Sequence, residues 1–378
     1  MIFNYNDVLV EESKKRDTNN YLSEAEIVEK YKKGEFRIVT EQARYPLAKL
    51  RDIFEPYNLT PDYQRRRIWD NKRKSRLIES FIINVPIPPV FLYEYDFSEY
   101  EVMDGLQRIT SIVEFFDNKF SLEGLELWYE LNGRYYNDLP DEIKKAIERR
   151  YLSAIILLKE TAKDSNQEKM MKRFVFSRLN TGGMELSPQE IRNAVYSSEF
   201  NDAITKMAES NIFRNLWGDL EDDSYKRMED CELVLRFFAY KSACKHNIAK
   251  NTLDILDLYA EKAKEFQVED IKILENLFFN TVNLVGSMFG DTAFKSEISS
   301  KRSEKMIYDT VMLCSAELIE EGFAEYLKEI DSKTLIDEKF RCIDKNKSVF
   351  NGKYTSIRNV KERVALLKRV LRGMINGI

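Results

Sequence analysis

Histidine is nearly absent from this chain of 378 residues, since His246 is the only one. HNH-type nuclease sites and histidine-rich zinc hydrolases need at least a pair of imidazole rings, so residues 1–378 carry neither. A Ser-His-Asp triad would have to use His246 itself. The residues around it, 243–247, are typical of a polar helix end, and we expect an ordinary surface histidine there.

Cysteine, glycine and proline are also scarce, with 4, 13 and 8 residues. The low glycine and proline content excludes collagen-like and low-complexity chains. The cysteines are far apart and form no CxxC pair, which argues against structural zinc and favours a reduced, cytoplasmic protein. No apolar run of about 18 residues occurs, and the first residues lack the pattern of a signal peptide, so we expect no membrane contact.

An excess of positive charge is missing too, because 59 lysines and arginines face 64 acidic residues and the net charge is −5. Any contact with nucleic acid must therefore come from a local basic patch. A hydrophobic content of 43% is enough for buried cores and excludes a wholly disordered chain. At about 150 residues per domain, the length allows two or three domains.

The hydrophobic pattern predicts an α+β protein with an N-terminal arm (1–35), a small mixed-sheet domain (36–160) and a mostly α-helical region (161–378). Strand patterns occur at 36–40, 90–95, 100–103 and 152–158. Helical spacing occurs at 46–54, after Asp70 up to Pro86, and at 106–116, 165–179, 232–240, 253–266, 268–289, 305–320 and 360–374. Residues 187–190, S-P-Q-E, form a capping box that starts another helix.

Residues 103–110, M-D-G-L-Q-R-I-T, pass from a strand through an Asp-Gly turn into a helix. A helix start offers unpaired N–H groups and a positive dipole, so a phosphate fits there. Gly105 lets the backbone approach an anion closely, while Gln107 and Arg108 can reach it from the first turn. Asp104 can hold a metal ion or orient a water. The alternative is a plain turn in which Asp104 caps the helix and Arg108 is solvated.

The densest positive run of the chain holds seven basic residues between positions 65 and 76. Such a run can contact the phosphates of a nucleotide or of a nucleic acid. The alternative for residues 72–76 is a solvated helix face, with Trp69 anchored in the core.

Residues 176–194 predict a helix, an Asn-Thr-Gly-Gly turn and a second, capped helix. The plain interpretation is that a glycine of the turn ends the first helix in a left-handed conformation. Asn180, Thr181, Arg192 and Asn193 nevertheless place polar side chains around this one turn, which can close over a ligand. We expect the turn, residues 180–183, near the junction of the two domains, where ligand sites are common.

Together these segments resemble the N-terminal domain family of GmrSD-type, modification-dependent restriction systems, which is described as ParB/sulfiredoxin-like. The family pattern combines P-D-[YF]-Q-R, P-I-P-P, D-G-Q-Q-R-[LI]-T and [FI]-x-R-[LI]-N-T-G-G-x-x-L-[ST]-x-Q-E-[LIM]-R-N-A. In this sequence these motifs stand at 61–65, 86–89, 104–110 and 176–194, and the resemblance extends over residues 36–375. One position departs from the pattern: Leu106 replaces the first Gln, on the buried side of the helix.

The resemblance implies a ParB/sulfiredoxin-like domain that binds nucleoside triphosphate and hydrolyses it with Mg²⁺. The implied catalytic residues are Asp104, Gln107 and Arg108, with Asp104 also the metal ligand. The implied nucleotide-binding residues are Gln64, Arg65, Gly105, Arg108, Thr110, Asn180, Arg192 and Asn193.

The resemblance also implies a regulatory role, because the DNA-cleaving part of this family is commonly an HNH domain. We therefore expect an NTP-hydrolysing component of a bacterial anti-phage or restriction system, with DNA and a separate nuclease subunit as partners. The alternative is a non-catalytic DNA-binding adaptor, or a metal-dependent DNA nickase, on the same scaffold. The sequence leaves open which nucleotide binds, which DNA modification is sensed and which oligomeric state forms.

Overall fold

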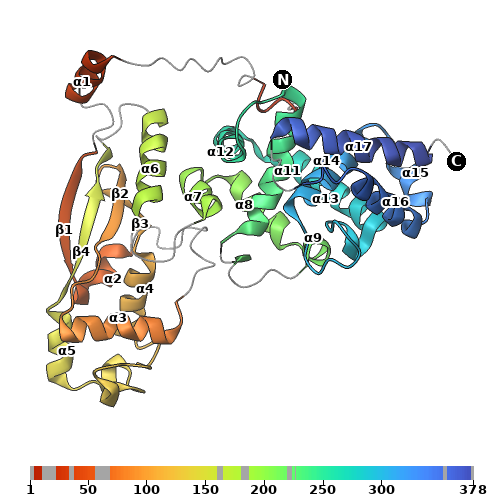
Figure 1. Cartoon of the computed structure of the whole chain (residues 1–378). Helices are drawn as coiled ribbons and strands as arrows, with labels where there is room; N and C mark the ends of the chain where they lie inside the picture. Colours follow the sequence, from red (N-terminus) through yellow and green to blue (C-terminus); the bar gives the residue numbers. More distant parts are fainter. Residues whose placement is uncertain are drawn as a thin grey trace. The chain divides into compact units, whose positions relative to one another are not determined.

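The computed structural model describes residues 4–10, 23–33, 38–55, 69–159, 165–179, 187–218, 224–225, 227–351 and 356–375. The chain divides into two compact units, each drawn in Figure 1. One unit, here the sheet unit, comprises Asn20–Val195. The other, the helical unit, comprises Met1–Asn19 and Tyr196–Ile378.

The sheet unit is built on a mixed four-stranded sheet with the order β1-β4-β2-β3. The strands are β1 (Thr40–Pro46), β2 (Val90–Asp96), β3 (Glu99–Asp104) and β4 (Tyr151–Leu157). Strand β4 pairs antiparallel with β1 and parallel with β2, and β2 pairs antiparallel with β3. A small mixed sheet in the N-terminal part, followed by helices, confirms the predicted α+β class.

Helices cover both faces of this sheet. On one face, α2 (Leu50–Phe54), α3 (Asn71–Ile83), α4 (Leu106–Phe116) and α5 (Asp141–Glu148) form the core with side chains such as Leu92 and Val102. On the other face lies α6 (Ser165–Leu179), whose Lys172 Nζ is 3.2 Å from Glu101 Oε2 and 4.0 Å from the Tyr93 ring centroid. Because side chains alternate along a strand, Tyr93 and Leu92 point to opposite faces.

Local capping signals set several helix boundaries where the sequence predicts them. Asp70 accepts a hydrogen bond from Arg73 N and begins α3, which ends at Asn84 in a left-handed conformation. Ser187 and Glu190 form the predicted capping box at the start of α7 (Pro188–Val195). Each cap satisfies backbone N–H groups that the first helical turn leaves without partners.

The helical unit packs its long helices around a core of aliphatic and aromatic side chains. The longest are α11 (Glu229–His246), α13 (Val268–Phe289), α14 (Lys305–Glu320) and α17 (Ile357–Ile375). Around them lie α8 (Glu199–Glu209), α9 (Asn211–Trp217), α12 (Thr252–Lys262), α15 (Ala324–Glu329) and α16 (Ser332–Lys345). No helix in the described part of the chain is long and apolar enough to cross a membrane.

The compact units differ from the expected domains in two respects. Helices α6 and α7, which the composition groups with the helical region, belong to the sheet unit, because α6 contacts the sheet and α7 packs on α6. The N-terminal arm is divided as well. Residues 4–10 belong to the helical unit, whereas the capped helix α1 (Glu24–Lys32) is grouped with the sheet unit.

Two local predictions need correction. The strand expected at 36–40 begins at Thr40 and runs to Pro46, while residues 34–37 lie outside the described part. His246 does lie at the end of α11, but its side chain is only 15% exposed. Its Nε2 is 2.9 Å from Asp7 Oδ1 and 3.1 Å from the carbonyl oxygen of Asn6, so the ring holds the N-terminal segment rather than facing solvent.

Candidate functional site

The candidate site begins where β3 passes into α4. The β2–β3 ladder pairs Phe91 with Asp104 and Leu92 with Val102, so one extra residue bulges from β3 beside the turn. Gly105 then takes a φ of +95°, which favours glycine, and it occupies the N-cap position of α4. A Cβ at this position would lie 2.4 Å from Val90 Cγ1. Only glycine fits this junction without displacing β2.

Arg108 is the central side chain of this junction. Its Nη2 donates to Asp104 Oδ2 at 2.6 Å and to the carbonyl oxygen of Pro89 at 3.2 Å. The Arg108 side chain is 15% exposed, and its Nε is a buried donor without a hydrogen-bond partner in the described residues. Arg108 is therefore not the solvated residue of the plain-turn alternative, and Asp104 pairs with it instead of capping the helix.

Gln107 and Thr110 face different surroundings from Arg108. Gln107 Oε1 accepts a hydrogen bond from Trp69 N at 3.1 Å, which connects the first turn of α4 to the residue preceding Asp70. Thr110 Oγ1 donates to the Leu106 carbonyl at 3.0 Å, within its own helix. Gln64 and Arg65, which the sequence assigns to the same site, lie outside the described residues.

The third predicted segment forms a polar cluster along α7. Arg192 Nη1 donates to Gln189 Oε1 at 3.1 Å, and Gln189 Nε2 donates to Asn193 Oδ1 at 2.8 Å. All three side chains are buried. Asn180, like the whole predicted turn at 180–183, lies outside the described residues.

Residues 47–197 match the family model described as GmrSD restriction endonuclease, N-terminal domain. This segment is therefore similar to a GmrSD-type N-terminal domain and is called the GmrSD-type domain below. It covers all of the site residues named above, and it ends two residues beyond the boundary of the sheet unit at Val195. No curated protein and no solved structure was found to match the chain.

Within the GmrSD-type domain, Asp104 directly precedes Gly105, the N-cap residue of α4. The described residues contain no group of three or more His, Cys, Asp or Glu side chains that could hold a metal ion. Mg²⁺ commonly binds through one or two carboxylates and takes its other ligands from waters and substrate phosphates. Asp104 could supply one such carboxylate ligand to Mg²⁺, with waters or phosphate oxygens as the others.

Sequence reasoning missed three partners in this site: the Pro89 carbonyl, the Trp69 amide and the Gln189 side chain. The P-I-P-P motif at 86–89 is visible in the sequence, but a carbonyl has no side-chain signature that would reveal its role. Trp69 precedes the capping residue of α3, so its N–H has no carbonyl of that helix to which it can donate. Gln189 belongs to the S-P-Q-E segment, whose pattern signals a helix start and no more.

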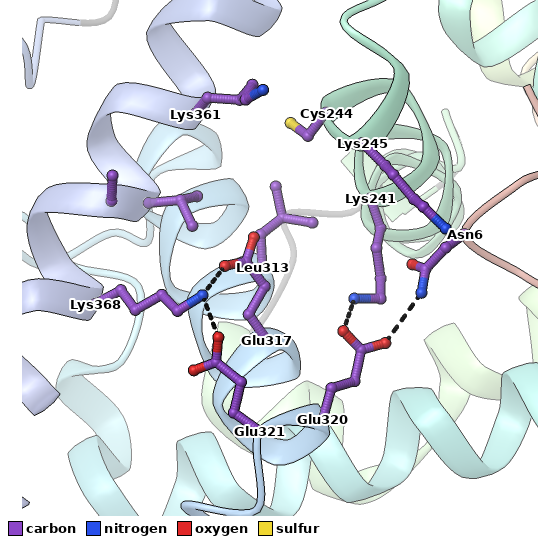
Figure 2. A pocket seen from close by; sticks show the side chains of 12 residues that line it. Asn6, Lys241, Cys244, Lys245, Leu313, Glu317, Glu320, Glu321, Lys361 and Lys368 are labelled. Atoms are coloured by element: carbon purple, nitrogen blue, oxygen red, sulfur yellow. Dashed lines mark hydrogen bonds and ion pairs between the residues drawn. The ribbon is translucent and has the colours of Figure 1, made fainter. Parts of the chain in front are cut away.

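A cavity of about 520 Å³ lies in the helical unit, and none of its lining residues belongs to the motifs of the GmrSD-type domain (Figure 2). Its wall carries Lys241, which donates to Glu320 at 2.8 Å, and Lys368, which lies 2.5 Å from Glu317 and 2.8 Å from Glu321. These charges neutralise one another across the cavity wall. The charge balance favours a structural network over a site for a strongly anionic ligand.

Proposed function

We propose that the GmrSD-type domain binds a nucleoside triphosphate at the start of α4 and hydrolyses it to regulate a DNA-cleaving partner. The observation that carries this proposal is the position of the Arg108 guanidinium. It lies beside Gly105, the residue with left-handed backbone conformation between β3 and α4. A helix start and a nearly buried arginine there offer an anion both N–H groups and a fixed cation. Residues 1–378 hold a single histidine, so an HNH centre would belong to another polypeptide or segment.

The Asp104–Arg108 ion pair holds the guanidinium in place at the start of α4. Asp104 Oδ2 accepts a hydrogen bond from Arg108 Nη2 at 2.6 Å and neutralises the guanidinium charge. A phosphate would take over this contact, and the displaced carboxylate would repel it unless a cation lies between them. Mg²⁺ supplies that charge neutralisation and polarises the phosphoryl oxygens when it is bound.

Hydrolysis would require a water held in line with the terminal phosphate. Gln107 lies in the first turn of α4, but its Oε1 accepts from Trp69 N. The amide N–H₂ group of Gln107 can donate hydrogen bonds to a phosphate or a water. Leu106 is 4% exposed and contributes to the core, so its replacement of the first Gln of the family pattern leaves packing intact.

Arg108→Ala tests the phosphate contact. We expect it to weaken triphosphate binding by about 1.5–3 kcal/mol, since it removes a charge-assisted hydrogen bond. The measurement is calorimetry with the nucleotide found by a thermal-shift screen of the four triphosphates. A ligand at a hundred times its dissociation constant adds about 2.7 kcal/mol of stability.

Arg51→Ala is the matched control, because Arg51 is an exposed arginine of the same unit that pairs with Asp117. It should leave the affinity unchanged. Equal affinities of wild type and Arg108→Ala would refute the phosphate role. The variant must be compared at a temperature where it remains folded, because Arg108 also ties α4 to the Pro89 carbonyl.

Asp104→Asn separates binding from hydrolysis. The amide keeps a hydrogen-bond acceptor for Arg108 but loses the charge, so triphosphate should still bind, and without Mg²⁺ at least as tightly as to wild type. Metal-dependent phosphate release should fall at least about tenfold, which corresponds to 1.4 kcal/mol of transition-state stabilisation. Equal turnover of the two proteins above background would exclude this role for Asp104.

The adaptor alternative depends on the basic run at 65–76 and on the basic C-terminal helix. The described part of the basic run is largely engaged within the molecule. Arg73 stacks on Trp69 at 4.7 Å, Lys74 pairs with Glu114 at 2.7 Å, and Arg76 pairs with Glu126 at 2.8 Å. Trp69 itself packs against the core, as the solvated-face alternative predicts. A steep salt dependence of DNA binding in a protein that binds no nucleotide would favour the adaptor function.

A further inference from the structure

Residues 4–10 lie on the helical unit as a short peptide that contacts α11 and α14. Leu9 is the one residue among them that is fully buried. Its backbone N–H donates to Ser242 Oγ of α11 at 3.0 Å, and the same hydroxyl donates to the Asn6 carbonyl at 3.2 Å. Main-chain hydrogen bonds and a buried side chain are the contacts by which proteins recognise peptides.

The other contacts of this segment are polar and accessible to water. Asp7 Oδ1 lies 2.7 Å from Lys245 Nζ and 2.9 Å from His246 Nε2, and the Asp7 and Lys245 side chains are 35% and 45% exposed. Tyr5 Oη donates to Glu320 Oε1 of α14 at 2.6 Å. Ion pairs with this exposure contribute little to stability. The segment is therefore held mainly by Leu9.

The surface beneath the segment is polar and keeps a partner of its own. Lys241 Nζ donates to Glu320 Oε2 at 2.8 Å, whereas Tyr5 and Asn6 donate to Oε1, so this ion pair does not need the segment. The polar groups of α11 that bind the segment can bond to water instead. Detachment exposes one leucine and a polar surface, which costs less free energy than opening the apolar core.

The segment also forms part of the cavity wall (Figure 2). Asn6 lines the cavity, and its Nδ2 donates to Glu320 Oε1 at 3.2 Å. Cys244 lies in the same wall. Beyond the segment, the chain passes into the sheet unit at Asn20 and returns to the helical unit at Tyr196. The segment therefore anchors one of the two chain connections between the units.

We infer that residues 4–10, here the N-terminal strap, are a detachable closure of the cavity, which leaves its site on α11 and α14 while these helices stay folded. The strap is an intramolecular peptide ligand. Because it belongs to the same chain, its effective concentration is on the order of millimolar, and weak contacts suffice to hold it. Release opens the cavity wall at Asn6 and frees one of the two connections to the sheet unit.

Alkylation of Cys244 in the full chain, quantified by mass spectrometry after digestion, measures strap release. Leu9→Ala should raise the rate at least about tenfold, because loss of a buried leucine side chain shifts the opening equilibrium strongly. The three buried cysteines of the same unit should keep their slow rates. Burial raises the pKa of the Cys244 thiol to about 12, so all rates are compared at one pH. Leu253→Ala is the matched control, since Leu253 is 48% exposed in the same unit.

A synthetic peptide of residues 4–10 gives an independent readout. At millimolar concentration it should restore the protection of Cys244 in the Leu9→Ala protein, whereas the same peptide carrying Leu9→Ala should not.

Ser242→Ala removes the strap's partner on α11 without changing the strap, and alanine favours the helix. It should also raise the alkylation of Cys244. Unchanged alkylation in both variants, or no rescue by the peptide, would overturn the proposal. An equal rise at all four cysteines would overturn it too, because the strap would then be part of the cooperative fold.

Discussion

At the scale of single residues, Gly105 has the most restricted position in the candidate site. Its φ of +95° disfavours every L side chain, and a Cβ would lie 2.4 Å from Val90 Cγ1 and 2.8 Å from Arg108 Nη2. Gly133 has a similar φ of +83°, but nothing lies within 4 Å of a Cβ there. A comparison of Gly105 with Gly133 therefore separates the cost of a left-handed backbone conformation from the cost of steric overlap.

Gly105→Ala should therefore destabilise the protein by about 1–3 kcal/mol more than Gly133→Ala, the typical cost of overpacking. Both variants share the cost of a left-handed alanine, about 1–2 kcal/mol. Urea denaturation of the two variants measures the difference. Equal losses of unfolding free energy in the two variants would mean that β2 and Arg108 move aside freely. That result would contradict a rigid junction.

At the scale of elements, Glu79 connects α3 to the loop that carries Trp128. Burial alone would raise the pKa of Glu79, but the N–H groups of Trp128, Glu126 and Leu127 and the charge of Arg76 outweigh it and hold the pKa below its ordinary value. A depressed folded-state pKa stabilises the fold at pH values above the unfolded pKa. This contribution is lost as the pH falls through the folded pKa.

Glu79→Gln should cost about 1.5–3 kcal/mol at neutral pH, because hydrogen bonds to a charged group are replaced by weaker ones. The difference from wild type should shrink in acid, where the wild-type carboxylate also becomes protonated. Denaturation at a series of pH values measures this stability difference. The control is Glu126→Gln, a substitution of an exposed glutamate. A difference that is independent of pH would show that the charge of Glu79 does not stabilise the loop.

At the scale of the whole molecule, each compact unit has its own buried centre. In the helical unit, Arg236 on α11 and Asp309 on α14 form a buried bidentate ion pair, with Nε–Oδ1 and Nη2–Oδ2 distances of 3.1 and 2.5 Å. Breaking such a pair leaves an uncompensated charge and costs about 3–5 kcal/mol. Asp309→Ala should therefore destabilise the helical unit strongly.

Hydrogen exchange resolved by segment tests this prediction. Protection should fall in α11 and α14 and stay near the wild-type level in the strands of the sheet unit. Lys328→Ala, which removes an exposed i,i+3 pair with Glu325, should change stability by no more than about 1 kcal/mol. Equal loss of protection in both units would mean that they unfold as one cooperative body.

The sequence by itself determined the elements that local interactions specify. The bounds of α6, α13 and α14 coincide with the helical spacing, and Asp70 and Ser187 mark the starts of α3 and α7. The Asp-Gly turn into α4 was equally predictable. Caps, periodic apolar faces and glycine turns act over a few residues, so the sequence displays them directly.

Only the tertiary structure decided the features that depend on distant partners. The residues of β1 are mostly polar and exposed, and they form a strand because Thr40–Pro46 pair with Tyr151–Leu157 of β4. Likewise, Arg108 is fixed by the carbonyl of Pro89, and His246 by Asp7 from the far end of the chain. Long-range strand pairing and buried hydrogen bonds have no local sequence pattern. Each forms only when the fold brings together two residues that are far apart in the sequence.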